Sequence, residues 1–421
     1  WVSGHVPEEF QRIEEILQSG KFEPTEEDIS LVQEKFQNCP GIVQSKLQSL
    51  KYIIRPPYPT LLEDEEDWSI DQWIQWTVSE YIPYREWQVR NNVYDGKLER
   101  MVARFSDWYV DSYMSVQGNT AYGLPHILRS VHRSTSEATL TVILLIDCLP
   151  INYASILENV LRQSGFHRHQ LSYRFSALPT VTEYNKGAII TGELGAIERG
   201  YKELMKERTA NDWGEIDSYY VSTVKELSEL RMESDAAIVL VNFNDGDEIL
   251  HSDVESKNRT YEEELSRSYS ALIRDLADLC GRWTGKHENV TVIVSTDHGA
   301  CRILDEERQS FDSTLIQKLF ADEKYRMASV TEEQAEKVPS NLWDFGYRFK
   351  TPFSEDDAVH FLPRGHNTVR KPGNKNTYMH GGVSPEEVIV PFSLYGMLAN
   401  SWKKLFIRPI NLDMNAAGDK A

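Results

Sequence analysis

The chain has 421 residues, of which 40% are hydrophobic and 26% charged, values typical of a soluble globular protein with two or three domains. They exclude wholesale disorder, and no apolar run approaches the roughly 18 residues that a membrane span requires. The 45 basic and 65 acidic residues give a net charge of −20, which disfavours a general nucleic-acid coat protein because phosphate backbones would be repelled.

The first predicted elements, over residues 8–131, are helices joined by polar breaks. In the first, residues 9–17, apolar residues recur near a period of 3.6, and the helix ends at Gly20. Prolines at positions 56, 57 and 59 forbid helix, and the acidic run 63–67 is interpreted as a solvated linker. A packed helical core is the preferred interpretation of the aromatic residues that follow, with a partner groove or base-stacking surface as the alternative. These residues are Trp68, Trp73, Trp76, Tyr81, Tyr84, Trp87 and Trp108.

After Ser134, strands that read as buried alternate with helical segments, a pattern typical of a mostly parallel sheet with helices on both faces. The sequence therefore predicts an α/β fold preceded by an all-helical region, with domains at residues 1–135 and 136–412. The predicted strands are residues 140–146, 236–243, 290–295 and 388–394, and the predicted helices are residues 154–162, 187–205 and 261–279.

Possible metal ligands stand where the predicted strands end, and ligands of open α/β sheets bind beyond the carboxyl ends of the strands. Taken alone, an aspartate or histidine at the end of a strand is more commonly a turn or helix-capping residue than a metal ligand. Together, three carboxylates and three imidazoles at one edge would be costly without cations, so the sequence predicts two divalent ions. Aspartate and histidine suit zinc, or manganese, better than magnesium alone. The candidates are Asp147, Asp247, His251, Asp297, His298 and His380.

Thr182 is the candidate nucleophile for a covalent group transfer. It precedes an apolar helical pattern and is expected to open a helix. A simple N-cap hydroxyl is the alternative interpretation. The amides of a helix N-terminus also favour a phosphate oxygen, and a nearby metal would favour the alkoxide, so one position can serve both purposes.

The ordered motifs resemble the PglZ domain of the alkaline phosphatase superfamily over residues 139–395. The most family-specific motif is the ending His-Gly-Gly-x-Ser-Pro-Glu-Glu at residues 380–387. The aromatic helices resemble, more loosely, regions that precede PglZ domains in phage-defence (BREX) proteins. The other motifs are Asp147, Pro179-Thr180-Val181-Thr182, Thr191-Gly192, Asp247-x-x-x-His251 and Asp297-His298-Gly299.

The resemblance implies which residues hold each ion. Thr182 would be the nucleophile. Asp245 is the nearest competitor for a ligand position, but only Asp247 stands four residues before His251. The nucleophile segment lacks the Cys or Ser, Pro and Arg of sulfatases, so sulfatase activity is disfavoured. The two implied triads are Asp147, Asp297 and His298, and Asp247, His251 and His380.

The expected activity is two-metal phosphoester hydrolysis through a phosphothreonine, on nucleotides or oligonucleotides, in bacterial phage defence. A phosphodiester is favoured over a monoester because no arginine stands beside the core motifs. The alternatives are a phosphomonoesterase, or an assembly subunit of a defence complex whose helical region docks a partner.

Two further features leave alternatives open. Cys148 is interpreted as a residue packed at a strand end, with an alternative nucleophile or soft ligand as the other possibility. A solvated loop or a cationic substrate rim could be formed by the residues before His380. The residues of this possible rim are His360, Arg364, His366, Arg370, Lys371 and Lys375.

The four cysteines lie far apart without a CxxC pair, which indicates that the protein is in the reducing cytoplasm.

Overall fold

A computed structural model describes most of the chain, and no helix in that part is long and apolar enough to cross a membrane. The predicted helix end at Gly20, most of the acidic run, Lys371, Lys375 and the predicted domain limit at residue 412 lie outside the described residues. The described residues are 6–18, 24–36, 50, 53–63, 67–133, 139–195, 199–213, 216–234, 236–257, 259–283, 289–311, 313–322, 324–352, 358–370 and 377–397.

A six-stranded sheet in the order β2-β13-β5-β1-β4-β3 forms the centre of the molecule. Strand β1 pairs in parallel with β4 and β5, and β3 pairs in parallel with β4. Only β13 reverses direction, running antiparallel to β5 and β2. The predicted mostly parallel α/β sheet is therefore confirmed. The strands are β1 (Leu140–Ile146), β2 (His167–Phe175), β3 (Asp217–Val221), β4 (Ala237–Phe243), β5 (Val290–Thr296) and β13 (Ile389–Gly396).

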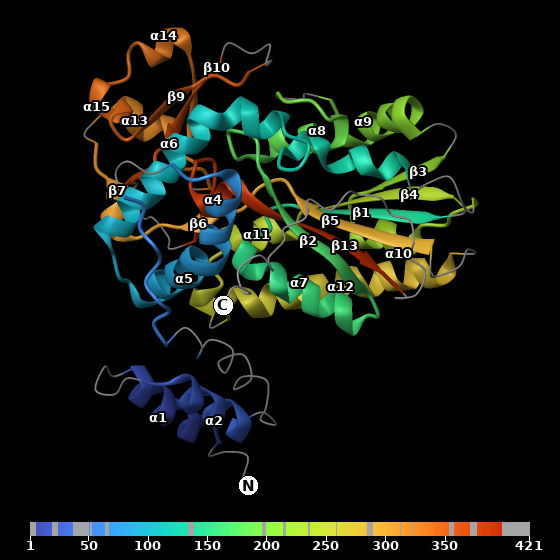
Figure 1. Cartoon of the computed structure of the whole chain (residues 1–421), viewed down its shortest axis with the longest axis horizontal. Helices are drawn as coiled ribbons and strands as arrows, with labels where there is room; N and C mark the ends of the chain where they lie inside the picture. Colours follow the sequence, from blue (N-terminus) through green and yellow to red (C-terminus); the bar gives the residue numbers. More distant parts are fainter. Residues whose placement is uncertain are drawn as a thin grey trace, which may run out of the picture.

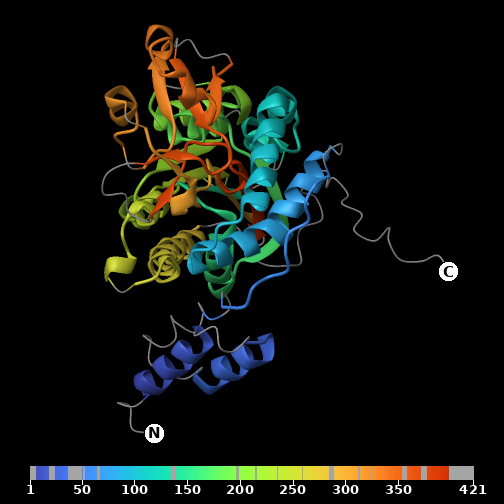
Figure 2. The ribbon, with the colours of Figure 1, turned by 90° about the vertical axis from the view of Figure 1, so that its left-hand side faces the viewer.

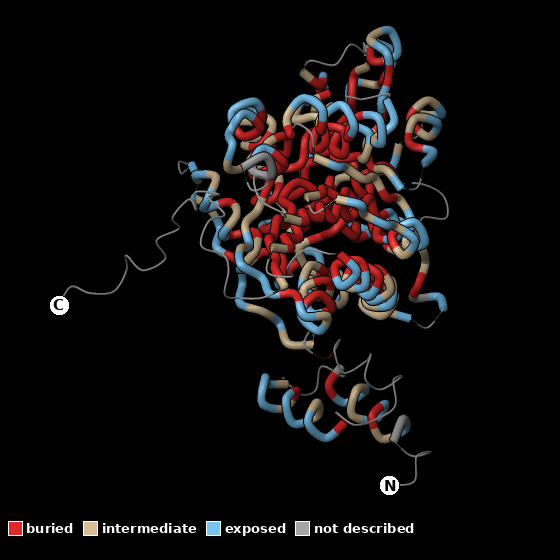
Figure 3. The backbone as a smooth tube through the Cα atoms, turned by 90° about the vertical axis from the view of Figure 1, so that its right-hand side faces the viewer, coloured by how far each residue is buried: buried red, intermediate tan, exposed pale blue. Residues whose placement is uncertain are grey.

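Helices cover both faces of this sheet (Figure 1). Helices α7, α10 and α12 pack on one face, and α8, α9 and the 3₁₀ helix η3 pack on the other. Every residue of β1, β4 and β5 is consequently buried, as expected for parallel strands covered on both sides, and Figure 3 shows this buried interior. The helices are η3 (Leu124–Arg133), α7 (Ile151–Gln163), α8 (Thr182–Thr191), α9 (Tyr201–Arg208), η4 (Thr209–Trp213), α10 (Val224–Glu229), α11 (Asp245–His251), η5 (Glu255–Lys257) and α12 (Tyr261–Arg282).

Two details of the predicted elements are wrong. The helix predicted over residues 187–205 is instead two helices, because Gly192 adopts a left-handed φ of 82° and ends α8. Strands β2 and β3 were not predicted, because they lie at the edges of the sheet and carry half-exposed polar residues rather than an apolar run.

The aromatic residues of the helical region pack in one cluster, in which Trp68, Trp87 and Trp108 are half-buried. Trp73, Trp76 and Tyr81 are buried, and they belong to one hydrophobic cluster with Phe175 and Val388 of the sheet domain. Figure 2 shows these helices against one side of the main body, whereas α1 and α2 pack on each other separately. The helices are α1 (Val6–Gln18), α2 (Glu26–Phe36), α4 (Ile70–Trp76), the π-helix η2 (Thr77–Tyr81), α5 (Ile82–Asn91) and α6 (Gly96–Gly118).

An insertion between β5 and β13 carries a second, three-stranded sheet in the order β8-β10-β9. Short strands at its two ends, β6 and β12, pair with each other and return the chain to the central sheet. The elements are β6 (Cys301–Arg302), η7 (Asp305–Glu307), β7 (Arg308–Gln309), α13 (Thr314–Leu319), β8 (Ala328–Thr331), α14 (Glu332–Ala335), α15 (Ser340–Trp343), β9 (Gly346–Phe349), β10 (Ala358–Pro363), β11 (Thr368–Val369), β12 (Tyr378–Met379) and α16 (Pro385–Val388).

A buried ionic network joins the helical region to this insertion. Arg85 donates to both carboxylate oxygens of Glu307, at 2.7 and 2.9 Å. His366 contacts Glu99 through Nδ1, at 2.7 Å, and Glu386 through Nε2, at 2.9 Å. Burial and Arg85 would lower the pKa of His366, but the surrounding carboxylates raise it to about 10.

This network predicts a loss of stability in alkali. The folded pKa of His366 lies above its ordinary value of 6.5, so its contribution is complete below pH 6.5 and is lost as pH rises through about 10. The free energy of unfolding should fall between these limits by up to about 1.4 kcal/mol per pH unit. Urea unfolding of the wild type at pH 7 and pH 10 measures the effect. His366→Gln should show a shallower decline, and equal slopes for the two proteins would contradict the assignment.

Candidate active site

The six predicted ligands and Thr182 meet at the carboxyl edge of the parallel strands. Asp147 follows β1, Asp247 and His251 lie on α11 after β4, and Asp297 follows β5. His380 precedes β13, whose reversed direction brings its start to the same edge. Two groups form, and within each the ligand atoms lie within 4.8 Å of one another. The groups are Asp147, Asp297 and His298, and Asp247, His251 and His380.

The first group lies beside the hydroxyl of Thr182. Its Oγ1 lies 3.4 Å from Asp147 Oδ1 and 3.3 Å from His298 Nε2. Asp297 Oδ1 accepts the backbone N–H groups of Cys148 and His298, at 3.1 and 3.0 Å. Its other oxygen, Oδ2, is buried and has no hydrogen-bond partner among the described residues. A cation bound there would satisfy it.

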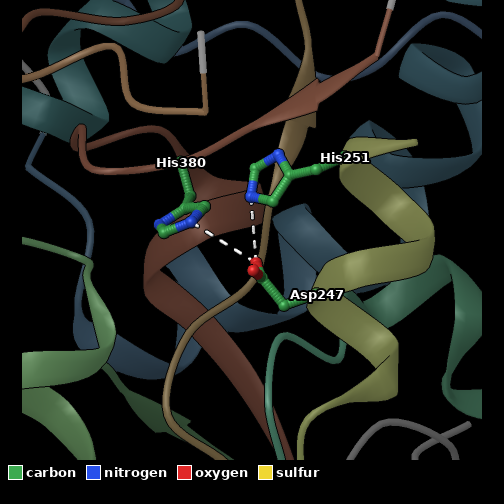
Figure 4. A group of neighbouring side chains, drawn as sticks. All are labelled: Asp247, His251 and His380. Carbon is green, nitrogen blue, oxygen red and sulfur yellow. Dashed lines mark ion pairs between the residues drawn. The ribbon is translucent and has the colours of Figure 1, made fainter. Parts of the chain in front are cut away.

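The second group is drawn in Figure 4. Asp247 and His251 are four residues apart on α11, so their side chains share one helix face. Asp247 Oδ1 lies 3.0 Å from His251 Nε2 and 3.5 Å from His380 Nε2. The groups adjoin, because the rings of His298 and His380 stack with centroids 4.1 Å apart.

Backbone carbonyls fix the tautomer of all three histidines. A carbonyl oxygen can only accept, so the Nδ1 atom facing it carries the proton and a neutral ring keeps its lone pair on Nε2. Each Nε2 points toward a carboxylate of the cluster, at 3.0 Å for His251, 3.5 Å for His380 and 3.6 Å for His298, where it can hold either a proton or a metal ion. The carbonyls belong to Tyr378 for His251 (2.9 Å), Gly299 for His298 (3.1 Å) and Thr180 for His380 (2.8 Å).

The charges of the cluster also suit metal ions. Burial and the neighbouring Asp297 raise the pKa of Asp147 to about 6, and burial raises the pKa of Asp297. Burial and His380 lower the pKa of His298 to about 3, so its ring is neutral near pH 7. Crowded carboxylates beside a neutral imidazole are the ligand chemistry of zinc and manganese. The residues therefore fit two divalent ions.

Thr182 is the first residue of α8 and not its cap. The N-cap is Val181, which is extended and makes no side-chain capping bond. Asn185, one turn into α8, instead secures the preceding loop by donating to the carbonyls of Pro179 and Val181, both at 2.9 Å. The Thr182 hydroxyl is thus directed at the ligands, and the N-cap interpretation is wrong.

The His-Gly-Gly-x-Ser-Pro-Glu-Glu motif shapes the loop that carries His380. Glu387 is buried, forms an ion pair with Arg326, and accepts the N–H groups of Gly382 (2.8 Å) and Ser384 (3.0 Å). A Cβ on Gly382 would lie 2.3 Å from the Arg326 guanidinium, so a larger residue would displace the pair. Gly299 is needed for a similar reason, because its Cβ would lie 2.0 Å from the carbonyl oxygen of Glu386.

Asp245 and Cys148 lie beside the cluster but face elsewhere. Asp245 Oδ2 accepts from Ser268 of α12, at 2.8 Å. Cys148 is fully buried, burial raises the pKa of its thiol well above the ordinary value, and its backbone has a φ of 57°. These contacts agree with Asp247 as the ligand and with Cys148 as a packed residue.

The different roles of Asp245 and Asp247 in metal binding can be measured. Asp245→Asn should keep the metal content and the turnover of the wild type within about twofold, because the amide oxygen can still accept from Ser268. Elemental analysis and steady-state kinetics would test this. The matched variant Asp247→Asn should lose metal from the second group, and a variant Asp245→Asn that loses metal would reverse the assignment.

The predicted rim residues that the structure describes are engaged within the fold. His360 contacts Tyr184 and Ser329 and is buried, and His366 belongs to the ionic network. Arg364 forms an ion pair with Asp107. Arg370 donates to the carbonyl of Asp305. The two histidines are therefore part of the buried fold, whereas Arg364 and Arg370 are half-exposed.

Sequence reasoning missed Lys186, which is buried one turn after Thr182 and donates to Asp147 Oδ2 at 2.6 Å. Its signal was present, because a single lysine stands within the apolar pattern of α8, four residues after the candidate nucleophile. A charge at such a position requires a buried partner.

A family model described as the BREX system PglZ alkaline phosphatase-like domain matches residues 129–394. Among solved structures, phosphonoacetate hydrolase from Sinorhizobium meliloti, in complex with phosphonoformate, is 10% identical with a TM-score of 0.35. The similarity covers 61% of this chain and 90% of that chain. An inactive form of murine ectonucleotide pyrophosphatase/phosphodiesterase 5, in complex with AMP, is 11% identical with a TM-score of 0.37, over 61% and 88% of the two chains. The comparison with curated proteins gave no match.

Proposed function

Because the chain belongs to the PglZ family of alkaline phosphatase-like domains, we propose that it is a two-metal phosphodiesterase that uses Thr182 as its nucleophile. Its substrates are nucleotides or oligonucleotides, and it acts in the cytoplasm in defence against phage. The observation that carries the proposal is the position of the Thr182 hydroxyl, 3.4 Å from Asp147 Oδ1 and 3.3 Å from His298 Nε2, beside a second ligand group.

Each ion has three side-chain ligands in this proposal. Zinc is the favoured metal and manganese the second candidate. When bound, the two ions supply Lewis acidity that stabilises negative charge on the phosphoryl and threonine oxygens. Asp147, Asp297 and His298 hold one ion, and Asp247, His251 and His380 hold the other.

The covalent step belongs to Thr182. Its Oγ1 attacks phosphorus, a Thr–O–P bond forms, the bond to the leaving oxygen breaks, and that oxygen leaves as an alcohol with the proton that the hydroxyl gave up. Water then attacks the phosphothreonine, which restores the hydroxyl and releases a phosphomonoester. Thr182 is the first residue of α8, so a phosphoryl group on its hydroxyl would lie at a helix N-terminus, whose partial positive charge favours an anion.

The arginines support a diester over a monoester. A monoester carries one more negative charge, which commonly requires an extra guanidinium. Arg326 lies beside the His380 loop, and Glu387 neutralises it. Arg364 is likewise paired with Asp107.

Hydrolysis of two chromogenic substrates tests the proposed function. Protein stripped by chelation should be inactive, and addition of zinc or manganese should restore two metal equivalents per chain together with hydrolysis of bis-nitrophenyl phosphate. We expect the diester to react at least about tenfold faster than nitrophenyl phosphate, which is about 1.4 kcal/mol of discrimination. A preference for the monoester would favour the phosphomonoesterase alternative. A metal-replete protein that hydrolyses neither substrate, nor short oligonucleotides, would contradict the proposal.

A further inference from the structure

A buried lysine lies behind the candidate nucleophile. The side chain of Lys186 is 1% exposed, and its ammonium donates to Asp147 Oδ2 at 2.6 Å and to Asn244 Oδ1 at 2.8 Å. Lys186 is four residues after Thr182 on α8, so both side chains leave the helix on the same face. The ammonium therefore links the nucleophile's helix to the ends of β1 and β4.

The two oxygens of Asp147 consequently have different surroundings. Oδ2 is held by Lys186, whereas Oδ1 faces Thr182 Oγ1 at 3.4 Å and His298 Nε2 at 3.8 Å. We propose that Lys186 is a positioning residue, which makes Asp147 a ligand through one oxygen and keeps that oxygen beside the Thr182 hydroxyl. The inference rests on the proposed function and adds a residue to its site.

The surrounding backbone shows why this link needs precise placement. Asp147 N–H donates to the carbonyl of Phe243, at 2.7 Å. A Cβ on Gly246 would lie 2.6 Å from the carbonyl oxygen of Asp147, so the start of α11 is packed tightly against the end of β1. Asn244 lies in this junction, three residues before Asp247. Through Asp147 and Asn244, Lys186 thus holds α8 in place relative to both ligand groups.

A charged donor suits this position better than a neutral one. Asp147 and Asp297 both belong to the first group, and an ammonium offsets part of their repulsion before any metal binds. An uncharged residue at position 186 would leave Asp147 Oδ2 free to turn toward the ion. A carboxylate that binds through both oxygens gives the ion a higher coordination number and leaves less room for Thr182 and substrate.

Cobalt(II) replaces zinc as a spectroscopic probe in the test. Wild type, Lys186→Met and Lys186→Arg are loaded with Co(II), and metal content, visible absorption and kinetics on bis-nitrophenyl phosphate are measured. We expect two equivalents in each protein. Lys186→Met should show weaker ligand-field bands, because band intensity falls as coordination number rises, and kcat about 100-fold lower with KM within about threefold. Lys186→Arg should recover most of both properties.

Several outcomes would overturn the inference. One is a Lys186→Met protein with the wild-type spectrum and wild-type kcat. Another is a rise in KM alone, which would make Lys186 a substrate contact. If Lys186→Met does not fold, Asn244→Ala serves as the second variant, because it removes the other hydrogen-bond acceptor of the ammonium. It should change the Co(II) spectrum in the same direction but by less. An unchanged spectrum would refute the proposal. Wild type that binds no Co(II) would instead refute the proposed function.

Discussion

Replacing Thr182 by alanine is expected to lower kcat on bis-nitrophenyl phosphate by about 1,000-fold or more while both metal sites remain filled. The hydroxyl is the group that would form the bond to phosphorus, and it lies 3.4 Å from Asp147 and 3.3 Å from His298 of the first group. The change should not disturb the fold, because Val181, not Thr182, caps α8 and alanine is a good helix former. Steady-state kinetics and elemental analysis of the same preparation distinguish loss of the nucleophile from loss of bound metal as the cause of the lower kcat.

Two control variants sharpen this result. Thr182→Ser keeps a hydroxyl at the same position and should retain activity within about tenfold. Thr191→Ala removes the hydroxyl at the other end of α8, which donates to the carbonyl of Gly187, and should leave kcat within about twofold. Full activity in a metal-replete Thr182→Ala protein would show that another group attacks phosphorus.

The positions of the site residues follow from local sequence patterns to a large extent. Apolar runs ending in Asp147 and Asp297 identify strands of a parallel sheet, whose carboxyl ends must share an edge. The spacing of Asp247 and His251 matches one helix face, and α11 has that face. Asp245, two residues earlier, falls on another face and contacts α12.

The features that could not be predicted from the sequence depend on contacts between residues far apart in the chain. The carbonyl that fixes the His380 tautomer belongs to Thr180, 200 positions away. Strand β2 forms because β13 pairs with it along an edge, although its own residues alternate poorly. A lone lysine in an apolar helix indicates a buried partner, but the identity of that partner as Asp147 and Asn244 appears only in the fold. Local propensity carries no information on such pairings.

Breaking the buried pair of Arg326 and Glu387 should destabilise the protein strongly. Both side chains are 0% exposed, and Glu387 also accepts the N–H groups of Gly382 and Ser384 in the His380 loop. Arg326→Met would leave a buried carboxylate without its partner, so we expect the free energy of unfolding to fall by about 3–5 kcal/mol. Urea unfolding at pH 7 measures this, and loss of metal from the second group should accompany it.

An exposed pair provides the matched control for this prediction. Arg348 pairs with Glu332 on the surface of the insertion, so Arg348→Met should cost at most about 1 kcal/mol. Equal losses in the two variants would mean that burial of the Arg326 pair adds nothing.

Acid should reduce the difference between wild type and Arg326→Met. Burial alone would raise the pKa of Glu387, but Arg326 and the two amides lower it below the ordinary 4.5. Its contribution is therefore complete above pH 4.5 and is lost as pH falls through the lowered pKa. In Arg326→Met the carboxyl loses its cation and takes up a proton at higher pH, which relieves the unpaired charge. The two unfolding free energies should then converge as pH falls below 4.5, and a gap that stays constant as pH falls from 7 would show that the cost arises from lost packing of Arg326 and not from its charge.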